Sequence, residues 1–160
     1  MALSLAVLIV PIVLLLIFYR LVLDGDAPAD VDPGPAIEEA QSARAFPVAE
    51  PGALAEGWHV TSAFFRHESS GATLRIGYVD PDGTSTQLVE SSVPPTTLLP
   101  AELGPTARPQ DTYRADARVW RLYQARPGEG ALVLAEAGRT VIVVGNARTN
   151  RLEELASSLS

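Results

Sequence analysis

The chain has 160 residues, a formal net charge of −7 and no cysteine. Without cysteine, disulfides, thiol catalysis and cysteine-ligated metals are excluded. The negative charge argues against nucleic-acid binding, because affinity for a phosphate backbone comes from clustered basic residues. All 12 basic residues are Arg, which together with abundant Ala, Gly and Pro is typical of a genome of high GC content.

The N-terminal segment is predicted to be a transmembrane helix. Residues 1–23 are dominated by Leu, Val, Ile and Ala, and the first charged side chain is Arg20. A helix of this length spans about 34 Å, enough to cross a hydrocarbon core of roughly 30 Å. A cleaved signal peptide is the alternative, with Ala27-Pro28-Ala29 as its cleavage motif. The apolar run is longer than the usual hydrophobic region of such peptides and no basic residue precedes it, so we expect an uncleaved single-pass anchor.

The acidic segment after the span indicates where the rest of the chain lies. Residues 24–45 are predicted to be a linker rich in acidic residues, Pro, Gly and Ala, with a short helix at residues 36–44. Between Arg20 and Arg44 there is no basic residue that would hold this flank in the cytoplasm. We therefore expect a cytoplasmic N-terminus and an extracytoplasmic C-terminal domain at the cell membrane.

Residues 46–160 are predicted to form one α+β domain whose first half contains three strands and a short helix. In the central strand of this half, Leu74, Ile76 and Tyr78 alternate with polar residues or Gly, as in a half-buried strand. The turn Asp80-Pro81-Asp82-Gly83 has Pro and Gly where a tight β-turn needs them, so it predicts a hairpin. The predicted strands are residues 58–66, 73–79 and 84–90, and the helix lies within residues 96–103.

The second half repeats this order, with predicted strands at residues 118–124, 131–136 and 140–145 and a closing helix. Val141-Ile142-Val143-Val144 is apolar on both faces, which is typical of a central strand. In the helix, Asn150 and Glu153 have the spacing of a cap and its partner. Leu152, Leu155 and Leu159 are expected to face the sheet, and Glu154 to lie exposed on the opposite side.

The likeness of the two halves suggests a degenerate βββα duplication. Trp58 and Trp120 hold the same place in each half. The alternative is that any two antiparallel meanders look alike at this level. Either way, the predicted fold is a mainly antiparallel β-sheet with one or two helices packed on one face.

Several short motifs together resemble a known family. They are Pro51-Gly52 with Gly57-Trp58, the strand end at residues 77–83, the mid-domain Trp120, Val-Ile-Val-Val-Gly-Asn at residues 141–146, and the Leu-rich close at residues 152–159. With the N-terminal span, the pattern resembles an uncharacterised actinobacterial family of single-span envelope proteins, domain of unknown function 4245. The resemblance implies an envelope location and brings no catalytic residues.

No catalytic, cofactor-binding or metal-ligating residues are predicted. His59 and His67 lie eight residues apart, about 26 Å along one strand, which is too far for a shared metal. A Ser–His–acid arrangement at His67-Glu68-Ser69 is disfavoured because adjacent residues seldom converge as a triad. The Asp80–Gly83 segment lacks the further oxygen ligands of a calcium loop. Gly145-Asn146 lacks the glycine pattern of a phosphate loop, so a helix start is favoured there.

Phe64 and Phe65 are the candidate partner surface. Adjacent residues of a strand point to opposite faces, so one of these rings lies under a helix or is exposed. The predicted function is a membrane-anchored extracytoplasmic binding or scaffolding module, not an enzyme, whose partner is another envelope or membrane protein. The alternative is a sensor or regulatory module that acts through a membrane partner.

Overall fold

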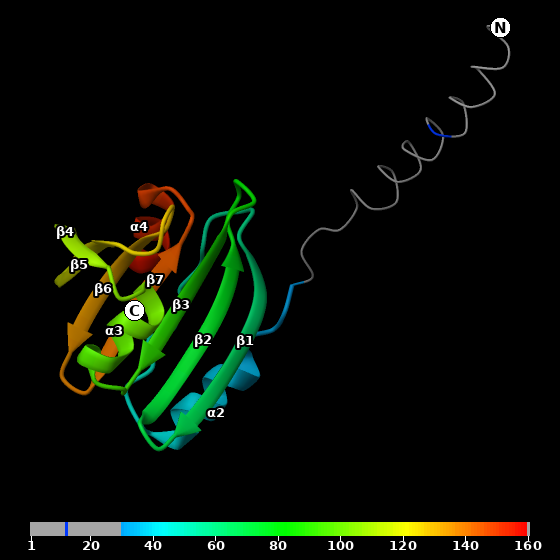
Figure 1. The fold of residues 1–160 in the computed structure, drawn as a ribbon. Coiled ribbons are helices and arrows are strands. Elements are labelled where there is room, and N and C mark those ends of the chain that lie inside the picture. Colours follow the sequence, from blue (N-terminus) through cyan, green and yellow to red (C-terminus); the bar gives the residue numbers. More distant parts are fainter. Residues whose placement is uncertain (1–11, 13–29, 160) are drawn as a thin grey trace, which may run out of the picture.

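The computed structural model describes residue 12 and residues 30–159, which centre on a seven-stranded antiparallel sheet (Figure 1). The strand order across the sheet is β1-β2-β3-β7-β6-β5-β4. This confirms the predicted mainly antiparallel α+β fold. In chain order the elements are α2 (Gly34–Ala43), β1 (His59–Glu68), β2 (Gly71–Val79), β3 (Ser85–Ser91), α3 (Pro95–Leu103), β4 (Arg108–Ala115), β5 (Arg118–Gln124), β6 (Gly130–Glu136), β7 (Arg139–Gly145) and α4 (Thr149–Ser158).

The pairing of β3 with β7 joins the two predicted meanders into one sheet. Leu88 lies opposite Val143, and Val89 lies opposite Ile142. The first six residues of β7 are buried, which confirms its prediction as a central strand. The β2–β3 hairpin also forms as predicted, because Asp80 Oδ1 accepts hydrogen bonds from the Asp82 and Thr84 backbone amides at 2.9 and 2.8 Å.

Helices cover both faces of the sheet. α2 and α4 lie on one face, where Ala40 and Leu155 join the core formed by Leu74, Ile76 and Val143. α3 lies on the other face, where its buried Leu residues pack over β3, β6 and β7. The prediction that the helices pack on one face is therefore wrong for α3. The physical reason lies in the central strands, whose apolar residues point both ways and need cover on each side.

The helices do not follow the predicted βββα duplication. With the observed strand order, a duplication would place a two-fold axis through the sheet between β3 and β7, relating the meander β1–β2–β3 to β5–β6–β7. Such an axis keeps each face on its own side, so it would place α3 and α4 together. They lie on opposite faces, and β4 has no counterpart before β1 among the described residues. The likeness of the halves is therefore confined to the strands.

Strand β4 was not predicted from the sequence. The first five of its eight residues are exposed. The strand lies at the edge of the sheet, where it pairs only with β5. Its register shifts between Pro109 and Asp111. An edge strand with a bulge, a Pro and charged side chains has no alternation of apolar residues that could reveal it.

The N-terminal part of the described chain is attached to the domain. The Val31 amide donates to the Val60 carbonyl oxygen at 2.8 Å, and the predicted short helix forms as α2. Its buried Ala36 and Ala40 belong to the core on the α4 face. The folded unit thus includes residues before Phe46. The described residues contain no helix that is long and apolar enough to cross a membrane, and the predicted span at residues 1–23 lies, apart from Ile12, outside them.

Helix α4 docks on the sheet through the predicted residues. Leu152, Leu155 and Leu159 are each no more than 5% exposed. Two details differ. The helix begins at Thr149 with Arg148 as its N-cap, and no side chain caps it, so the predicted pairing of Asn150 with Glu153 is wrong. Glu154 is not free on the outer side, because its Oε1 accepts a hydrogen bond from Trp58 Nε1 at 3.1 Å.

Candidate functional site

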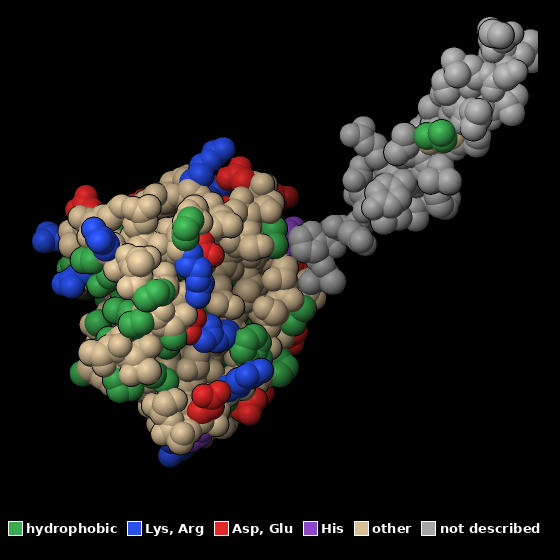
Figure 2. Space-filling view, viewed as in Figure 1, with side chains coloured by type: hydrophobic (Ala, Val, Ile, Leu, Met, Phe, Trp, Pro, Cys, Tyr) green, Lys and Arg blue, Asp and Glu red, His purple; other side chains and the backbone are tan. Residues whose placement is uncertain are grey.

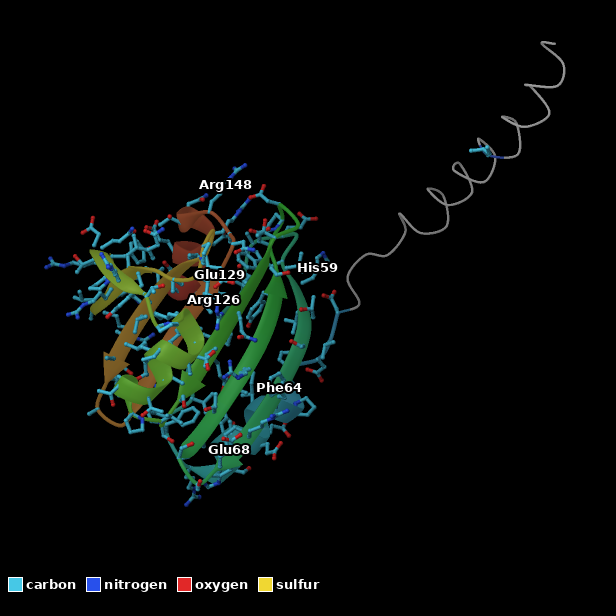
Figure 3. All side chains as sticks on the ribbon, viewed as in Figure 1. His59, Phe64, Glu68, Arg126, Glu129 and Arg148 are labelled. Atoms are coloured by element: carbon cyan, nitrogen blue, oxygen red, sulfur yellow. The ribbon has the colours of Figure 1, made fainter. Side chains whose placement is uncertain are left out.

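Phe64 and Phe65 point to opposite faces of β1. Phe65 packs against the core beneath α2 and α4. Phe64, labelled in Figure 3, is 37% exposed on the α3 face. The Arg66 guanidinium carbon lies 5.5 Å from its ring centroid. The structure therefore identifies Phe64 as the exposed ring of the two. Its role in a partner surface stays a prediction.

Phe64 lies beside a groove, because α3 covers only the central strands of its face and leaves β1 and β2 open (Figure 1). The groove consists of two hollows that share Glu102, one of about 320 Å³ and one of about 300 Å³. We call them the Phe64 pocket and the Arg126 pocket, and together the trough. The Phe64 pocket is lined by Phe64, Arg66, Glu68, Ser70, Gly71, Thr73, Arg75, Val93, Thr97, Leu98, Ala101 and Glu102, and the Arg126 pocket by Thr61, Gly77, Tyr78, Ser85, Thr86, Gln87, Glu102, Arg126, Glu129, Val144, Gly145 and Asn146.

An ion pair between β2 and α3 separates the two pockets. Arg75 Nη1 donates to Glu102 Oε2 at 2.7 Å, and Arg75 Nη2 donates to Glu102 Oε1. Arg75 Nη1 also lies 3.3 Å from Gln87 Oε1 on β3. The hydrogen bond to Glu102 raises the pKa of Arg75 above its ordinary value, against the opposing effect of burial. Both charges are thus fixed in a two-point arrangement that holds α3 against the open strands.

Arg126 closes the other end of the trough. It belongs to the turn between β5 and β6, and its Nη2 donates to the Ala101 carbonyl oxygen at 3.1 Å. Its Nη1 lies 3.5 Å from Glu129 Oε2. In Figure 3, Phe64 and Glu68 mark one end of the trough and Arg126 and Glu129 the other. Figure 2 shows basic side chains along the middle of this face.

The floor of the Arg126 pocket depends on a glycine. A Cβ atom at Gly77 would lie 2.5 Å from Ser62 Oγ and 3.2 Å from Thr61 Oγ1. The bare backbone of β2 therefore lets the hydroxyl groups of β1 approach closely. Several polar side chains, from Thr61, Ser85, Gln87 and Asn146, line this pocket.

The sequence as a whole matches one family model. The model is described as "Protein of unknown function (DUF4245)" and matches residues 1–159. The chain belongs to this family. No curated protein and no solved structure matches it. The family predicted from the sequence motifs of this DUF4245 protein is thus confirmed. The description of the family assigns it no function.

The trough of this DUF4245 domain offers contacts for binding. Neither His nor Cys is among the described residues that line it. The Glu102 carboxylate is engaged by two nitrogen atoms of Arg75. A ligand would meet hydroxyl groups, amides, one exposed aromatic ring and the exposed charged side chains of Arg66, Glu68 and Arg126. Such a lining suits recognition by hydrogen bonds and ring contact.

Two of the residues weighed for other chemistry, His59 and Asp80, have structural partners in the part of the chain that is described. His59 Nδ1 lies 3.0 Å from Asp30 Oδ1, and His67 is exposed near the other end of β1. Asp80 caps its own turn through the two hydrogen bonds already given. Within the described residues, no three acidic or His side chains gather as a metal would need.

A buried ion pair on the α4 face escaped the sequence analysis. Glu90 is fully buried in β3, and its Oε2 accepts hydrogen bonds from the Ala49 amide at 2.9 Å and from Arg139 Nη1 at 3.3 Å. Arg139 Nη1 also donates to the Pro47 carbonyl oxygen at 2.6 Å, and Arg139 Nη2 donates to Glu136. The pair thus fastens residues 47–49 to the sheet. No sequence spacing signals these contacts, because Ala49, Pro47 and Arg139 are joined to their partners across 41, 92 and 49 residues of the chain.

Burial dominates the electrostatics of this pair. It raises the pKa of Glu90 to about 7, although the Ala49 hydrogen bond and the charge of Arg139 lower that pKa. Glu90 Oε1 is buried and has no hydrogen-bond partner among the residues that the structure describes. Burial also raises the pKa of Tyr78 above its ordinary value, and the Glu90 charge adds to this rise. Neither Glu90 nor Arg139 lines the trough, so we expect this ion pair to act on stability.

Proposed function

We propose that this DUF4245 protein is a membrane-anchored binding or scaffolding module of an actinobacterial cell envelope, and that the trough is its contact surface. The observation that carries the proposal is the pair of adjoining pockets on the open half of the α3 face, with Phe64 at their side. A hollow lined by both polar and apolar groups beside an exposed aromatic ring is typical of a recognition site.

Binding without catalysis is supported by the state of the charged groups. Arg75 and Glu102 engage each other at two points, and Arg126 is held by the Ala101 carbonyl oxygen and lies beside Glu129. A catalytic acid or base needs a proton-transfer group that is positioned toward a substrate. The paired groups of the trough instead fix the shape of the surface.

The tether is supported by the sequence. The apolar residues 1–23 are long enough to span a bilayer, and the acidic flank that follows favours an extracytoplasmic domain. An Arg-only basic set in a chain rich in Ala, Gly and Pro supports an origin in a GC-rich genome such as an actinobacterial one. In this proposal the partner is another molecule of the envelope.

Reporter fusions test the tether and its orientation. Alkaline phosphatase, which is active only outside the cytoplasm, and a reporter active only in the cytoplasm are fused in turn after Ser160. We expect phosphatase activity in the membrane fraction and no activity of the cytoplasmic reporter, because the acidic flank lacks the charge that retains a loop inside.

The matched control carries three Arg residues in place of Asp24, Asp26 and Asp30. These substitutions should reduce phosphatase activity, since they add positive charge next to the span. Activity of the cytoplasmic reporter alone in the natural sequence, or phosphatase activity released into the soluble fraction, would contradict the anchored extracytoplasmic placement.

A further inference from the structure

We propose that the trough binds an uncharged, hydroxyl-rich ligand, a neutral saccharide chain. The inference rests on the proposed function, since it names the class of ligand for the same surface. It is drawn from the charge balance, the hydrogen-bonding groups and the shape of the trough.

The charged side chains of the trough balance in number, and its central pair is neutralised internally. The described residues that line it include Arg66, Arg75 and Arg126 on the one hand and Glu68, Glu102 and Glu129 on the other. The acidic and basic side chains are thus equal in number, and the Arg75–Glu102 pair is joined by two hydrogen bonds. At the Arg75–Glu102 and Arg126–Glu129 pairs, an anionic or cationic ligand would have to compete with the internal partner, whereas a neutral ligand leaves both pairs in place.

The hydrogen-bonding groups of the Arg126 pocket suit hydroxyl groups. Thr61 and Ser85 offer hydroxyls that both donate and accept, and Asn146 offers an amide with both capacities. Asn146 and Ser85 are exposed, so a ligand can reach them. A sugar hydroxyl also donates and accepts, so such a ligand can match mixed groups without leaving a polar atom unpaired.

The Phe64 pocket adds an apolar side. Phe64, Val93 and Leu98 line it, and the Phe64 ring is partly exposed. The C–H groups of a sugar ring can pack against the face of an aromatic ring, which carries partial negative charge. The hydroxyl groups at the edge of the sugar then stay in contact with water. Because both pockets border Glu102, a chain of several sugar units can contact the two in succession.

Titration of the full chain tests this inference. The ¹⁵N-labelled protein, in a zwitterionic detergent without a sugar headgroup, is titrated with neutral gluco-, manno- and galacto-tetrasaccharides. A sulfated tetrasaccharide and an uncharged tetrapeptide are the comparison ligands. We expect a neutral tetrasaccharide to shift amide signals in both pockets, including those near Phe64 and Asn146, and to leave the β4–β5 edge unchanged.

Single substitutions locate the contact. Phe64→Ala and Asn146→Ala each remove one group from one pocket, and each should raise the Kd about fivefold or more, as the loss of roughly 1 kcal/mol of contact does. The control is Val119→Ala, which removes a side chain that is 52% exposed on β5 outside the trough and should leave the Kd unchanged. Urea midpoints of all three variants verify folding, and Asn146→Ala carries the test if Phe64→Ala does not fold.

The outcomes distinguish the trough as a binding surface from the saccharide as its class of ligand. Shifts in the trough with the peptide or the sulfated ligand, and none with any neutral saccharide, overturn the saccharide class but leave the trough as a binding surface. Shifts with a neutral saccharide that occur away from both pockets overturn the assignment of the site. Absence of shifts with every ligand overturns the inference, while the proposed function is then judged by capture of cellular partners.

Discussion

Replacing Leu155 by Ala is expected to lower the free energy of unfolding by roughly 2–5 kcal/mol. Leu155 lies in α4, is fully buried, and belongs to the core that α4 and α2 form with the sheet. Removal of a buried Leu side chain loses its transfer free energy and leaves a cavity. The loss is a large share of the roughly 5–15 kcal/mol that holds a typical domain together.

Asn150→Ala in the same helix is the matched control for Leu155→Ala. Asn150 is exposed and does not cap the helix, so its replacement should cost less than about 0.5 kcal/mol. Glu154 would be a poor control because it accepts the hydrogen bond from Trp58. Urea unfolding of a fragment that begins at Asp30 gives the comparison. Equal midpoints for the two variants would mean that α4 is not docked on the sheet.

Replacing Arg139 by Leu is expected to destabilise the fold by about 3–5 kcal/mol at pH 8 and by clearly less at pH 5. Arg139 has a side chain only 6% exposed and supplies the charge that faces buried Glu90. At pH 8 the substitution leaves the Glu90 carboxylate buried without its counter-charge. At pH 5 Glu90, whose pKa is about 7, is protonated in the fold, so the loss of the counter-charge matters less.

The natural chain should itself depend on pH through Glu90. The pKa of Glu90 lies near 7 in the fold and near 4.5 in the unfolded chain, so the folded state holds the proton more tightly. The stabilisation of the fold by protonated Glu90 is fully present below pH 4.5 and is lost as the pH rises through 7. At roughly 1.4 kcal/mol per pKa unit, the free energy of unfolding falls by about 3 kcal/mol over this range. Besides burial, the Ala49 amide and Arg139 lower the pKa of Glu90, and the charge of Glu136 raises it.

Glu90→Gln is the control for this pH dependence, because Gln cannot ionise and its carbonyl oxygen can still accept the Ala49 hydrogen bond. Unfolding midpoints measured from pH 5 to pH 8 should fall in the natural chain and stay more nearly level in Glu90→Gln. Equal slopes would show that Glu90 does not titrate in this range. An Arg139→Leu cost that is the same at both pH values would contradict the role of Arg139 as its counter-charge.

Much of the fold could be predicted because its strands carry local signals. The alternation through Leu74, Ile76 and Tyr78 places β2, and the turn at residues 80–83 places its hairpin. The apolar residues of β7 identify the centre of the sheet. Such patterns reflect burial on one or two faces, which each strand shows in its own sequence.

The missed features depend on contacts between distant parts of the chain. β4 is an exposed edge strand, so burial leaves no mark on its sequence. The face that α3 covers follows from the apolar pattern of β3, β6 and β7 taken together. Glu154 seemed exposed on its helix, yet it bonds Trp58, 96 residues away.

The candidate site was predictable only in part. The adjacent Phe64 and Phe65 indicated that one ring faces away from its neighbour, since strand residues alternate. The trough itself arises because α3 leaves β1 and β2 open and because Arg75 meets Glu102 across that gap. Neither partner of this ion pair stands in a motif, and only the three-dimensional fold brings them together.

Photo-cross-linking in cells tests the binding role of the trough most directly. p-Benzoylphenylalanine, which inserts into nearby C–H bonds, replaces Phe64 in one full-length variant and Val119 in another, both exposed positions of the sheet. We predict specific adducts of the envelope fraction at position 64, reduced by the added substitution Asn146→Ala, and none at position 119. Adducts that are equal at the two positions, or confined to position 119, would contradict the trough as the contact surface of this protein.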